Sequence, residues 1–448
     1  MATARIKTTT VLVGLLSVLL AGPTIYNADL PRTVRVLGMF RQPANTAIVE
    51  TSNFVVIADT PHCEDLHFHA PNNLLFTACE GNEETRFSWF PPLVNFDDPS
   101  VTLKSRGAIH VIDPKTMKAQ RLALEDFDGP FVTHGIDVIS DPEKPAGEAV
   151  YIFAVNHVPN PAYYGDALSG TPPAAGSDTA KSRSRVEIFR HEIGSASVRH
   201  IRSVWDPLIR TPNDIVALSP TSFLVTNDHI YREGLMRTVE DMYFGAKWTD
   251  TIHVTLNALG SATSDTEGVV ATVALDKMHN NNGLGHGRTA DEVLVVECIS
   301  GILNLGRFVS NETKTSTIRI EDFVKFDSPI DNPSYYADPF ADSRHDASSY
   351  VAPGLGRAVD LHKAVRDSSG KEPVPVMIWS AKTAPSGDSS SRKWETRLLF
   401  EDDGSRIRSA SAAVQVAIDP AEEGGDKRAW LFVTGFIAEN IIAVKVDV

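Results

Sequence analysis

The chain has little cysteine, little positive charge and few long apolar runs, and each shortage narrows what it can be. Three cysteines among 448 residues, Cys63, Cys79 and Cys298, allow at most one internal disulfide and leave at least one of them outside it. Forty-two basic residues stand against 57 acidic ones, and a formal charge of −15 argues against a nucleic-acid partner. A negative balance instead suits cation binding or simple solubility.

Only one run is apolar enough to interact with a membrane, and it lies at the N-terminus. Arg5 and Lys7 precede an apolar stretch from Val11 to Gly22 that Pro23 interrupts. This order is typical of a secretory signal, either cleaved or retained as a membrane anchor. We therefore expect residues 1–30 to be a signal or anchor and residues 31–448 to form one domain of a secreted or membrane-anchored protein. The glycosylation acceptor at Asn311 fits that route.

Long helical periodicities are scarce beyond residue 33, whereas short β-rich runs bounded by turn residues recur, which indicates an all-β fold. The runs form six weak repeats, each with a polar opening, a strand, a turn and a second strand. Their spacing of roughly 50 to 80 residues predicts a six-bladed β-propeller. The repeats cover residues 64–81, 134–157, 213–229, 281–308, 330–382 and 413–446.

Three stretches interrupt the repeats. Residues 158–185 are rich in Pro, Gly, Ser and Ala and predict a surface loop. Residues 232–248 have apolar side chains at helical spacing, so we expect a short helix over one end of the propeller that packs into the core or forms a lid. A membrane-contact surface is the alternative for that helix. The aromatic residues of 83–100 line a pocket rim or cover the edge of the core.

Carboxylate and amide side chains open four of the repeats in pairs. Because the inner strand of every blade faces one central channel, these pairs are expected to converge although they are distant in sequence. Their oxygens are the hard ligands that Ca²⁺ prefers, and two residues of a pair could serve two different ions. Turn chemistry explains any single pair, but four pairs in phase with the repeat favour a cation site. The pairs are Glu64–Asp65, Asn213–Asp214, Asn281–Asn282 and Asp331–Asn332.

Two histidines follow the same phase. His134 opens the second repeat and His157 ends the strand that pairs with it. A neutral imidazole near a cation-bound substrate can act as a general base for water, and a second imidazole can set its tautomer. A packed histidine without a chemical role is the alternative.

These motifs, in this order, resemble the serum paraoxonase/arylesterase family. The motifs are "EDL" at 64–66, "HGI" at 134–136, "VNH" at 155–157, "NDIVA" at 213–217, "TNDH" at 226–229, "NG" at 282–283 and "DN" at 331–332. The resemblance implies a six-bladed propeller with two calcium ions that hydrolyses lactones, aryl esters and, promiscuously, organophosphates. It assigns the catalytic calcium to Glu64, Asn213, Asn282, Asp331 and Asn332. It assigns the structural calcium to Asp65, Asp214 and the carbonyl of Ile136, and the dyad to His134 and His157.

The mechanism that the resemblance implies is ester hydrolysis at a cation that polarises the carbonyl, with water activated by His134. No G-x-S-x-G motif is present, which argues against a serine esterase. The family's disulfide to the extreme C-terminus has no counterpart here, since no cysteine follows Cys298. Closure of the ring must then rest on strand pairing, for which residues 33–38 are a candidate. Two alternatives stay open: a propeller enzyme of the gluconolactonase or strictosidine-synthase type, and a calcium-stabilised binding propeller without catalysis.

Overall fold

The computed structural model describes residues 30–165, 168, 179–243, 245–260, 262–310, 316–383 and 393–448. The proposed signal or anchor segment, most of the 158–185 loop and the acceptor Asn311 lie outside these residues. Among the described residues, no helix has the length and apolar character needed to cross a membrane.

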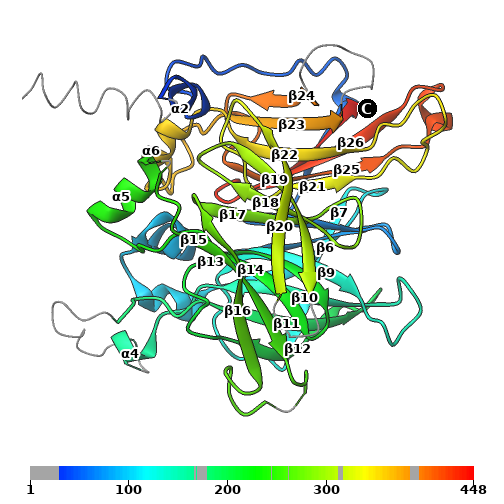
Figure 1. Ribbon diagram of the computed structural model, residues 1–448. Coiled ribbons are helices and arrows are strands. Elements are labelled where there is room, and N and C mark those ends of the chain that lie inside the picture. The colour runs from blue at the N-terminus through cyan, green and yellow to red at the C-terminus, as the bar shows by residue number, and fades with distance from the viewer. Residues whose placement is uncertain are drawn as a thin grey trace, which may run out of the picture.

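Six sheets, each built on four antiparallel strands, make up the fold, and each sheet is one blade of a β-propeller (Figure 1). Blade one contains β2 (Cys63–His69), β3 (Leu74–Cys79), β6 (Ala108–Asp113) and β7 (Lys118–Arg121). Blade two contains β9 (Thr133–Ser140), β10 (Ala149–Asn156), β11 (Arg185–Glu192) and β12 (Ser197–Val204), which β8 (Ala123–Glu125) extends in parallel. Blade three contains β13 (Pro212–Ser219), β14 (Ser222–Asn227), β15 (Thr249–Leu256) and β16 (Val269–Met278).

The remaining blades have the same plan. Blade four contains β17 (Asn281–His286), β18 (Glu292–Glu297), β19 (Ile302–Ser310) and β20 (Ser316–Lys325). Blade five contains β21 (Ser334–Tyr336), β22 (Ser349–Leu355), β23 (Val376–Thr383) and β24 (Trp394–Asp402). Blade six contains β25 (Ala410–Ala417), β26 (Arg428–Gly435), β27 (Ile441–Asp447) and β1 (Phe54–Ile57). The predicted six-bladed propeller is confirmed, and each of the six repeats supplies strands of one blade.

The inner strands form a closed ring, because β2, β9, β13, β17, β21 and β25 each contact the next and β25 contacts β2. Between every two neighbouring blades lies an apolar cluster of buried side chains. Such clusters form because the middle strands are covered on both faces and read as nearly continuous apolar runs, as in "AVYIFAV" of β10. The ring thereby holds its inner strands in fixed positions around one channel.

Closure of the ring differs from the expectation for residues 33–38. These residues belong to the helix α2 (Leu30–Val36) and the turn after it, and Pro31 stands in the first turn, where its missing amide costs nothing. The strand that closes the ring is β1, which pairs with β27 from Phe54 opposite Val444 to Ile57 opposite Ile441. N-terminal and C-terminal segments thus complete one blade without a disulfide between them.

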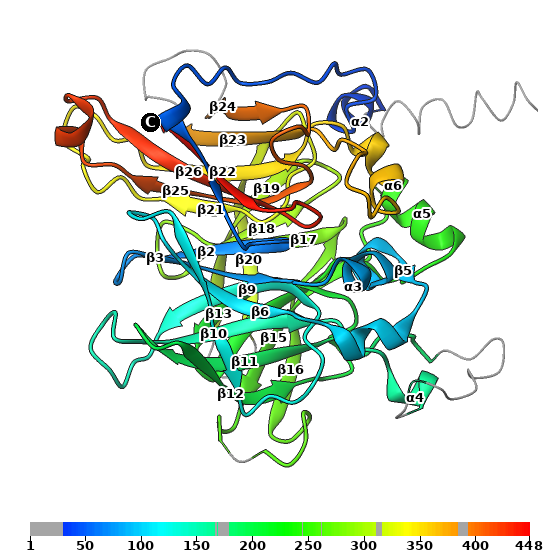
Figure 2. The ribbon, with the colours of Figure 1, turned by 180° about the vertical axis from the view of Figure 1, so that it is seen from behind.

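Short helices gather at one end of the propeller, on the left in Figure 1 and on the right in Figure 2. They are α2, α3 (Glu83–Ser88), α4 (Pro161–Tyr164), α5 (Leu235–Met242) and α6 (Leu361–Ala364). Two short strands, β4 (Trp89–Phe90) and β5 (Asn95–Phe96), lie among them. Single 3₁₀ turns cover Thr51–Asn53, Pro91–Leu93, Pro99–Lys104, Ala358–Asp360 and Pro420–Glu423.

Helix α5 forms within the predicted range, but its apolar side chains do not pack into the core as expected. Leu235 and Met242 are exposed, whereas Arg237 and Glu240 are buried. The reason is polar: the Glu240 carboxylate accepts the amides of Ile230 and Tyr231, and Arg237 donates to the carbonyl of Pro92. Helix α5 is therefore fixed to the propeller through its charged residues.

Candidate functional site

The inner strands of five blades carry a β-bulge close to their first residue. At each bulge two consecutive residues oppose one residue of the neighbouring strand, so the alternation of side chains between two faces is interrupted. The doubled residues are Glu64–Asp65, His134–Gly135, Asn213–Asp214, Asn282–Gly283 and Ser411–Ala412. Bulges often re-aim side chains beside functional sites, and here they bring residues of separate blades together at one end of the channel.

Glu64 lies at the centre of the first group. Its two carboxylate oxygens accept from Nδ2 of Asn332, at 3.0 and 3.2 Å, and its Oε1 lies 3.8 Å from Nε2 of His134. Asn213 belongs to the same end of the channel, where its Nδ2 donates to Asp228 at 3.4 Å. Glu64 is only 1% exposed, so its charge is removed from water.

Several oxygens of this group have no hydrogen-bond donor, although they are shielded from solvent. They are Oδ1 of Asn213, Asn282, Asp331 and Asn332. A buried acceptor without a donor costs about 1–3 kcal/mol, and four of them in residues of the inner ring call for a partner. A hard cation satisfies carboxylate and amide oxygens at once. The residues therefore fit a calcium ion held by Glu64, Asn213, Asn282, Asp331 and Asn332.

Electrostatics favour the same cation. Burial raises the pKa of Glu64 well above its usual range, and the negative charges of Asp331 and Asp65 raise it further. Burial also raises the pKa of Asp331, again with Asp65 contributing. Carboxylates whose pKa is raised in this way lack a positive charge nearby that would stabilise their ionised form. Among the described residues, no group of three His, Cys, Asp or Glu side chains is placed to hold a metal ion. In this site, three of the five residues that supply oxygen atoms are asparagines.

Asp65 and Asp214 form a second group, deeper in the channel. Asp65 accepts the amides of Leu66 and Ile136, and Asp214 accepts those of Ile215 and Leu284, all at 2.7 to 2.9 Å. Each carboxylate thus joins its own blade to the next one. Burial and the charge of Asp65 raise the pKa of Asp214. Ile136 contacts this group through its amide, which donates to Asp65. The carbonyl of Ile136 is the one assigned to the structural ion.

Two glycines of the motifs allow the blades to approach at this level. A Cβ on Gly135 would lie 2.4 Å from the carbonyl oxygen of Asn213, and a Cβ on Gly283 would lie 2.7 Å from that of Asp331. Both distances are too short for any side chain, so glycine is required at a bulge where another backbone passes closely. The motifs "HGI" and "NG" are explained by this approach.

Buried threonines stand opposite two of the bulges and beside a third, and they were not recognised in the sequence. Thr77 donates to the carbonyl of Asp65, and Thr434 donates to that of Glu64. Thr226 accepts the amide of Asp214 at 3.1 Å and donates to the carbonyl of Asn282 at 2.6 Å. In the sequence, only the spacing between these threonines and the acidic pairs of adjacent strands could have indicated this role.

Thr226 gives a direct test of this support. Thr226→Val keeps the shape but leaves the Asn282 carbonyl without its donor, so we expect the free energy of unfolding to fall by about 1–3 kcal/mol. The midpoint of thermal unfolding measures the effect, and Thr317→Val on the exposed side of β20 is the control. A Thr226 variant as stable as the control would show that the hydroxyl does not support the bulge.

The two predicted histidines lie together. Nε2 of His157 is 3.0 Å from Nδ1 of His134, and Nδ1 of His157 is 2.8 Å from Oγ of Ser184. Burial lowers the pKa of His134 to about 3, and burial together with His134 lowers the pKa of His157. Both rings are neutral at physiological pH, and His134 lies between His157 and Glu64.

A cover of aromatic and charged residues encloses the pair. Phe90 packs edge-on against His134 and His157, with ring centroids 5.1 and 5.5 Å away, and the Arg86 guanidinium lies 3.9 Å above the Phe90 ring. Trp89 donates to the carbonyl of His157. A cavity of about 10 Å³ lies beside His157. Arg86, Trp89 and Phe90 of the stretch 83–100 therefore cover the two histidines.

Asp228 is a further residue of the site. It belongs to the "TNDH" motif, but no role was predicted for it. It contacts Asn213 and pairs with His229, whose Nδ1 lies 3.1 Å from its Oδ1. Although burial acts to raise the pKa of Asp228, His229 and Arg237 hold it below its usual range. Asp228 therefore remains a carboxylate and orients the amide of Asn213.

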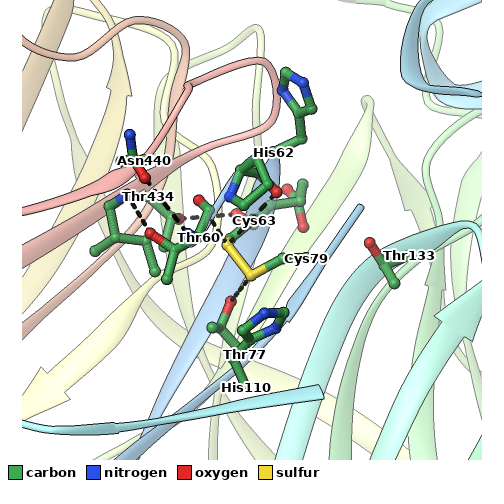
Figure 3. The surroundings of a disulfide bond; sticks show 12 residues. Thr60, His62, Cys63, Thr77, Cys79, His110, Thr133, Thr434 and Asn440 are labelled. Carbon is green, nitrogen blue, oxygen red and sulfur yellow. Dashed lines mark hydrogen bonds between the residues drawn. A yellow bond between two sulfur atoms is a disulfide. The ribbon is translucent and has the colours of Figure 1, made fainter. Parts of the chain in front are cut away.

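A disulfide joins Cys63 to Cys79, and Cys298 is free. Cys63 and Cys79 stand opposite each other in β2 and β3, directly before the Glu64–Asp65 bulge. Figure 3 shows Thr60, Thr77 and Thr434 around the bond, and Cys63 Sγ lies 3.1 Å from the Thr60 carbonyl. The sequence allowed one internal bond but did not identify this pair. The bond fixes the register of the strand that carries Glu64.

Comparisons with known proteins agree with the motifs. The family model described as Arylesterase matches residues 178–273. Serum paraoxonase/arylesterase 2 of Gallus gallus is 29% identical over 33% of this chain and 35% of its own length. Serum paraoxonase/arylesterase 1 of Mus musculus is 26% identical over 45% of each chain. Serum paraoxonase/arylesterase 2 of Homo sapiens is 27% identical over 47% of this chain and 52% of its own. The matches thus span about a third to a half of these relatives.

Solved structures resemble the fold more distantly. A luciferin-regenerating enzyme is 10% identical, with a TM-score of 0.42 over 88% of this chain and 95% of its own. The periplasmic gluconolactonase of Pseudomonas aeruginosa is 11% identical, with a TM-score of 0.35 over 86% and 85%. The family model and the curated relatives point to the same group as the motifs: over about a third to a half of its length the chain is similar to serum paraoxonases/arylesterases.

Proposed function

We propose that the protein is a calcium-dependent hydrolase of lactones and aryl esters. The observation that carries the proposal is the set of buried Oδ1 atoms without donors on Asn213, Asn282, Asp331 and Asn332, next to the buried carboxylate of Glu64. A second ion would be held by Asp65, Asp214 and the carbonyl of Ile136. The arylesterase names of the relatives support an aryl ester as substrate.

A bound calcium ion would supply a Lewis acid that polarises the ester carbonyl and stabilises negative charge on its oxygen. The side chains have separate tasks. His134 accepts the proton of the attacking water, and His157 holds the His134 ring through the 3.0 Å contact. Phe90 and Trp89 exclude bulk water from the two rings. Because a ring of such low pKa holds a proton weakly, we expect the cation to contribute more to the rate than His134 does.

His134→Gln tests the proposed base. We expect kcat/KM for phenyl acetate to fall about ten- to a hundredfold while calcium affinity stays unchanged, because general-base catalysis contributes modestly at this pKa. Initial rates and a calcium titration measure the two quantities, and His362→Gln, at an exposed histidine outside the dyad, is the control. An unchanged rate would remove the dyad from the mechanism and leave the cation in place.

A substrate panel tests the function as a whole. It comprises phenyl acetate, γ- and δ-lactones and a phosphotriester, each assayed with calcium and with EGTA. Chelator-sensitive hydrolysis of phenyl acetate, with or without the lactones, supports the proposal. Turnover of a lactone alone favours a gluconolactonase-like enzyme. If every substrate is inert and EGTA only lowers the thermal stability, the protein is a binding propeller and the proposal fails.

We also propose that the protein follows the secretory route, with association to a membrane through residues 1–30 if they are retained. The Cys63–Cys79 disulfide supports this, because such bonds persist mainly in oxidising compartments. Expression of the full chain with a reporter, followed by fractionation and N-terminal sequencing, tests both parts. Recovery of the whole chain in the cytosolic fraction would refute them.

A further inference from the structure

A large cavity lies at the end of the channel opposite the histidine dyad. Its volume is about 1040 Å³, and its walls include the turns between β2 and β3, β6 and β7, and β25 and β26. The helices gather at the other end of the propeller (Figure 2). A volume of this size accommodates a small organic molecule.

A histidine–carboxylate–histidine cluster lines this cavity. Nδ1 of His67 lies 2.7 Å from Oδ1 of Asp137, and Nε2 of His286 lies 2.8 Å from Oδ2. The amide of Ala217 donates to the same Oδ2 at 2.6 Å. The four residues come from the inner strands of four consecutive blades, β2, β9, β13 and β17. Asp137 is 2% exposed and its charge is balanced by these donors.

The cluster presents acceptors to the cavity. A carboxylate can only accept, so each ring gives an N–H to Asp137. In a neutral ring the second nitrogen, Nε2 of His67 or Nδ1 of His286, is then an acceptor. Gln415 adds a third acceptor: it lines the cavity and is 4% exposed, and its Oε1 has no hydrogen-bond donor. A buried amide oxygen without a donor calls for one from a ligand or water.

The walls and the rim narrow the ligand class. Phe68, Tyr335 and Trp430 supply aromatic surface on which the C–H face of a ring can pack. Asp419 and Glu422 at the rim repel anions. A ligand that fits is uncharged, rich in O–H donors and about the size of a monosaccharide.

We propose that this cavity is a second binding site, separate from the dyad, for a neutral polyhydroxylated molecule of sugar size. Its hydroxyl groups donate to His67, His286 and Gln415, while its ring packs against Tyr335 or Trp430. The Asp137 carboxylate holds both imidazoles in one tautomer and orientation. The cavity reaches Asp65 and Ile136, which the proposed structural ion would contact, but neither His134 nor His157 lines it.

Binding of methyl β-glucoside, sorbitol and myo-inositol to the full chain tests the proposal, with gluconate as the charged counterpart. Saturation-transfer NMR and calorimetry are expected to detect at least one neutral probe and to show weaker binding of gluconate. Gln415→Leu and His286→Phe are each expected to weaken binding about tenfold, the effect of one lost hydrogen bond. His362→Ala serves as the control with full affinity.

Three results would overturn the proposal: no neutral probe binds, gluconate binds more tightly than the neutral probes, or both cavity variants bind as the wild type does. Thermal unfolding shows whether each variant is folded. If Gln415→Leu does not fold, His286→Phe carries the test, because the His286 side chain lies at the partly exposed edge of the cluster. His134→Gln must retain binding, because its loss would place the probe at the proposed catalytic end. The measurement on His134→Gln therefore distinguishes failure of this binding site from failure of the proposed function.

Discussion

Asp331→Ala is expected to lower kcat/KM for phenyl acetate by about a thousandfold or more, because losing a charged ligand removes the cation that stabilises the developing oxyanion. Asp331 lies among buried carboxylates and amides, and its Oδ1 has no donor within the protein. Asn213→Ala removes a neutral oxygen at the same level and is expected to act in the same direction. Initial rates at saturating calcium measure both effects.

The control for this prediction is Asp346→Ala, which removes an exposed carboxylate outside the channel and is expected to leave the rate unchanged. Asp331→Ala also removes a repulsive charge from Glu64, so the variant is expected to fold without calcium. A folded Asp331 variant with the wild-type rate would show that this carboxylate does not hold the catalytic ion.

Removal of calcium is expected to lower the midpoint of thermal unfolding by roughly 10 °C. Glu64, Asp65, Asp214 and Asp331 lie close together, and without a cation Glu64, Asp65 and Asp331 each raise the pKa of at least one of the others. An ion present at a thousandfold excess over its dissociation constant contributes about 4 kcal/mol to the free energy of unfolding. Two ions at one hub therefore account for a shift of that order.

Differential scanning calorimetry in EGTA, and after calcium is restored, measures this effect. Magnesium is expected to restore less, since it demands a tighter octahedral shell than a mixed set of amides and carboxylates provides. The variant Asp214→Asn removes one charge from the deeper group and is expected to reduce the shift. An unfolding midpoint that is identical with and without chelator would contradict two structural roles for the cation.

The blade plan could be predicted from the sequence because every blade repeats the same order of turn residues and apolar strands. The pairs Glu64–Asp65 and Asn213–Asp214 were recognisable for the same reason, since they open repeats in phase. The bulges were not predictable, because a bulge is a mismatch in register between two strands and depends on both of them. Thr226 illustrates this: its hydroxyl serves Asn282 of the next blade, 56 residues away.

Other features depended on the ends of the chain and on residues without periodicity. Residues 33–38 alternate like a strand, yet they form part of α2, and the pairing partner of β27 lies further along the chain. The apolar spacing in α5 suggested packing into the core, but buried polar bonds of Arg237 and Glu240 decided its orientation. The cluster of His67, Asp137 and His286 carries no motif, because its members meet only through the ring.

The most direct measurement is an anomalous difference map from crystals grown in calcium and recorded at long wavelength. If calcium is bound as proposed, we expect a peak about 2.4 Å from side-chain oxygens of Glu64, Asn213 and Asp331, and a second peak beside Asp65 and Asp214. A channel with no anomalous peak near these oxygens, in crystals of active protein, would contradict it.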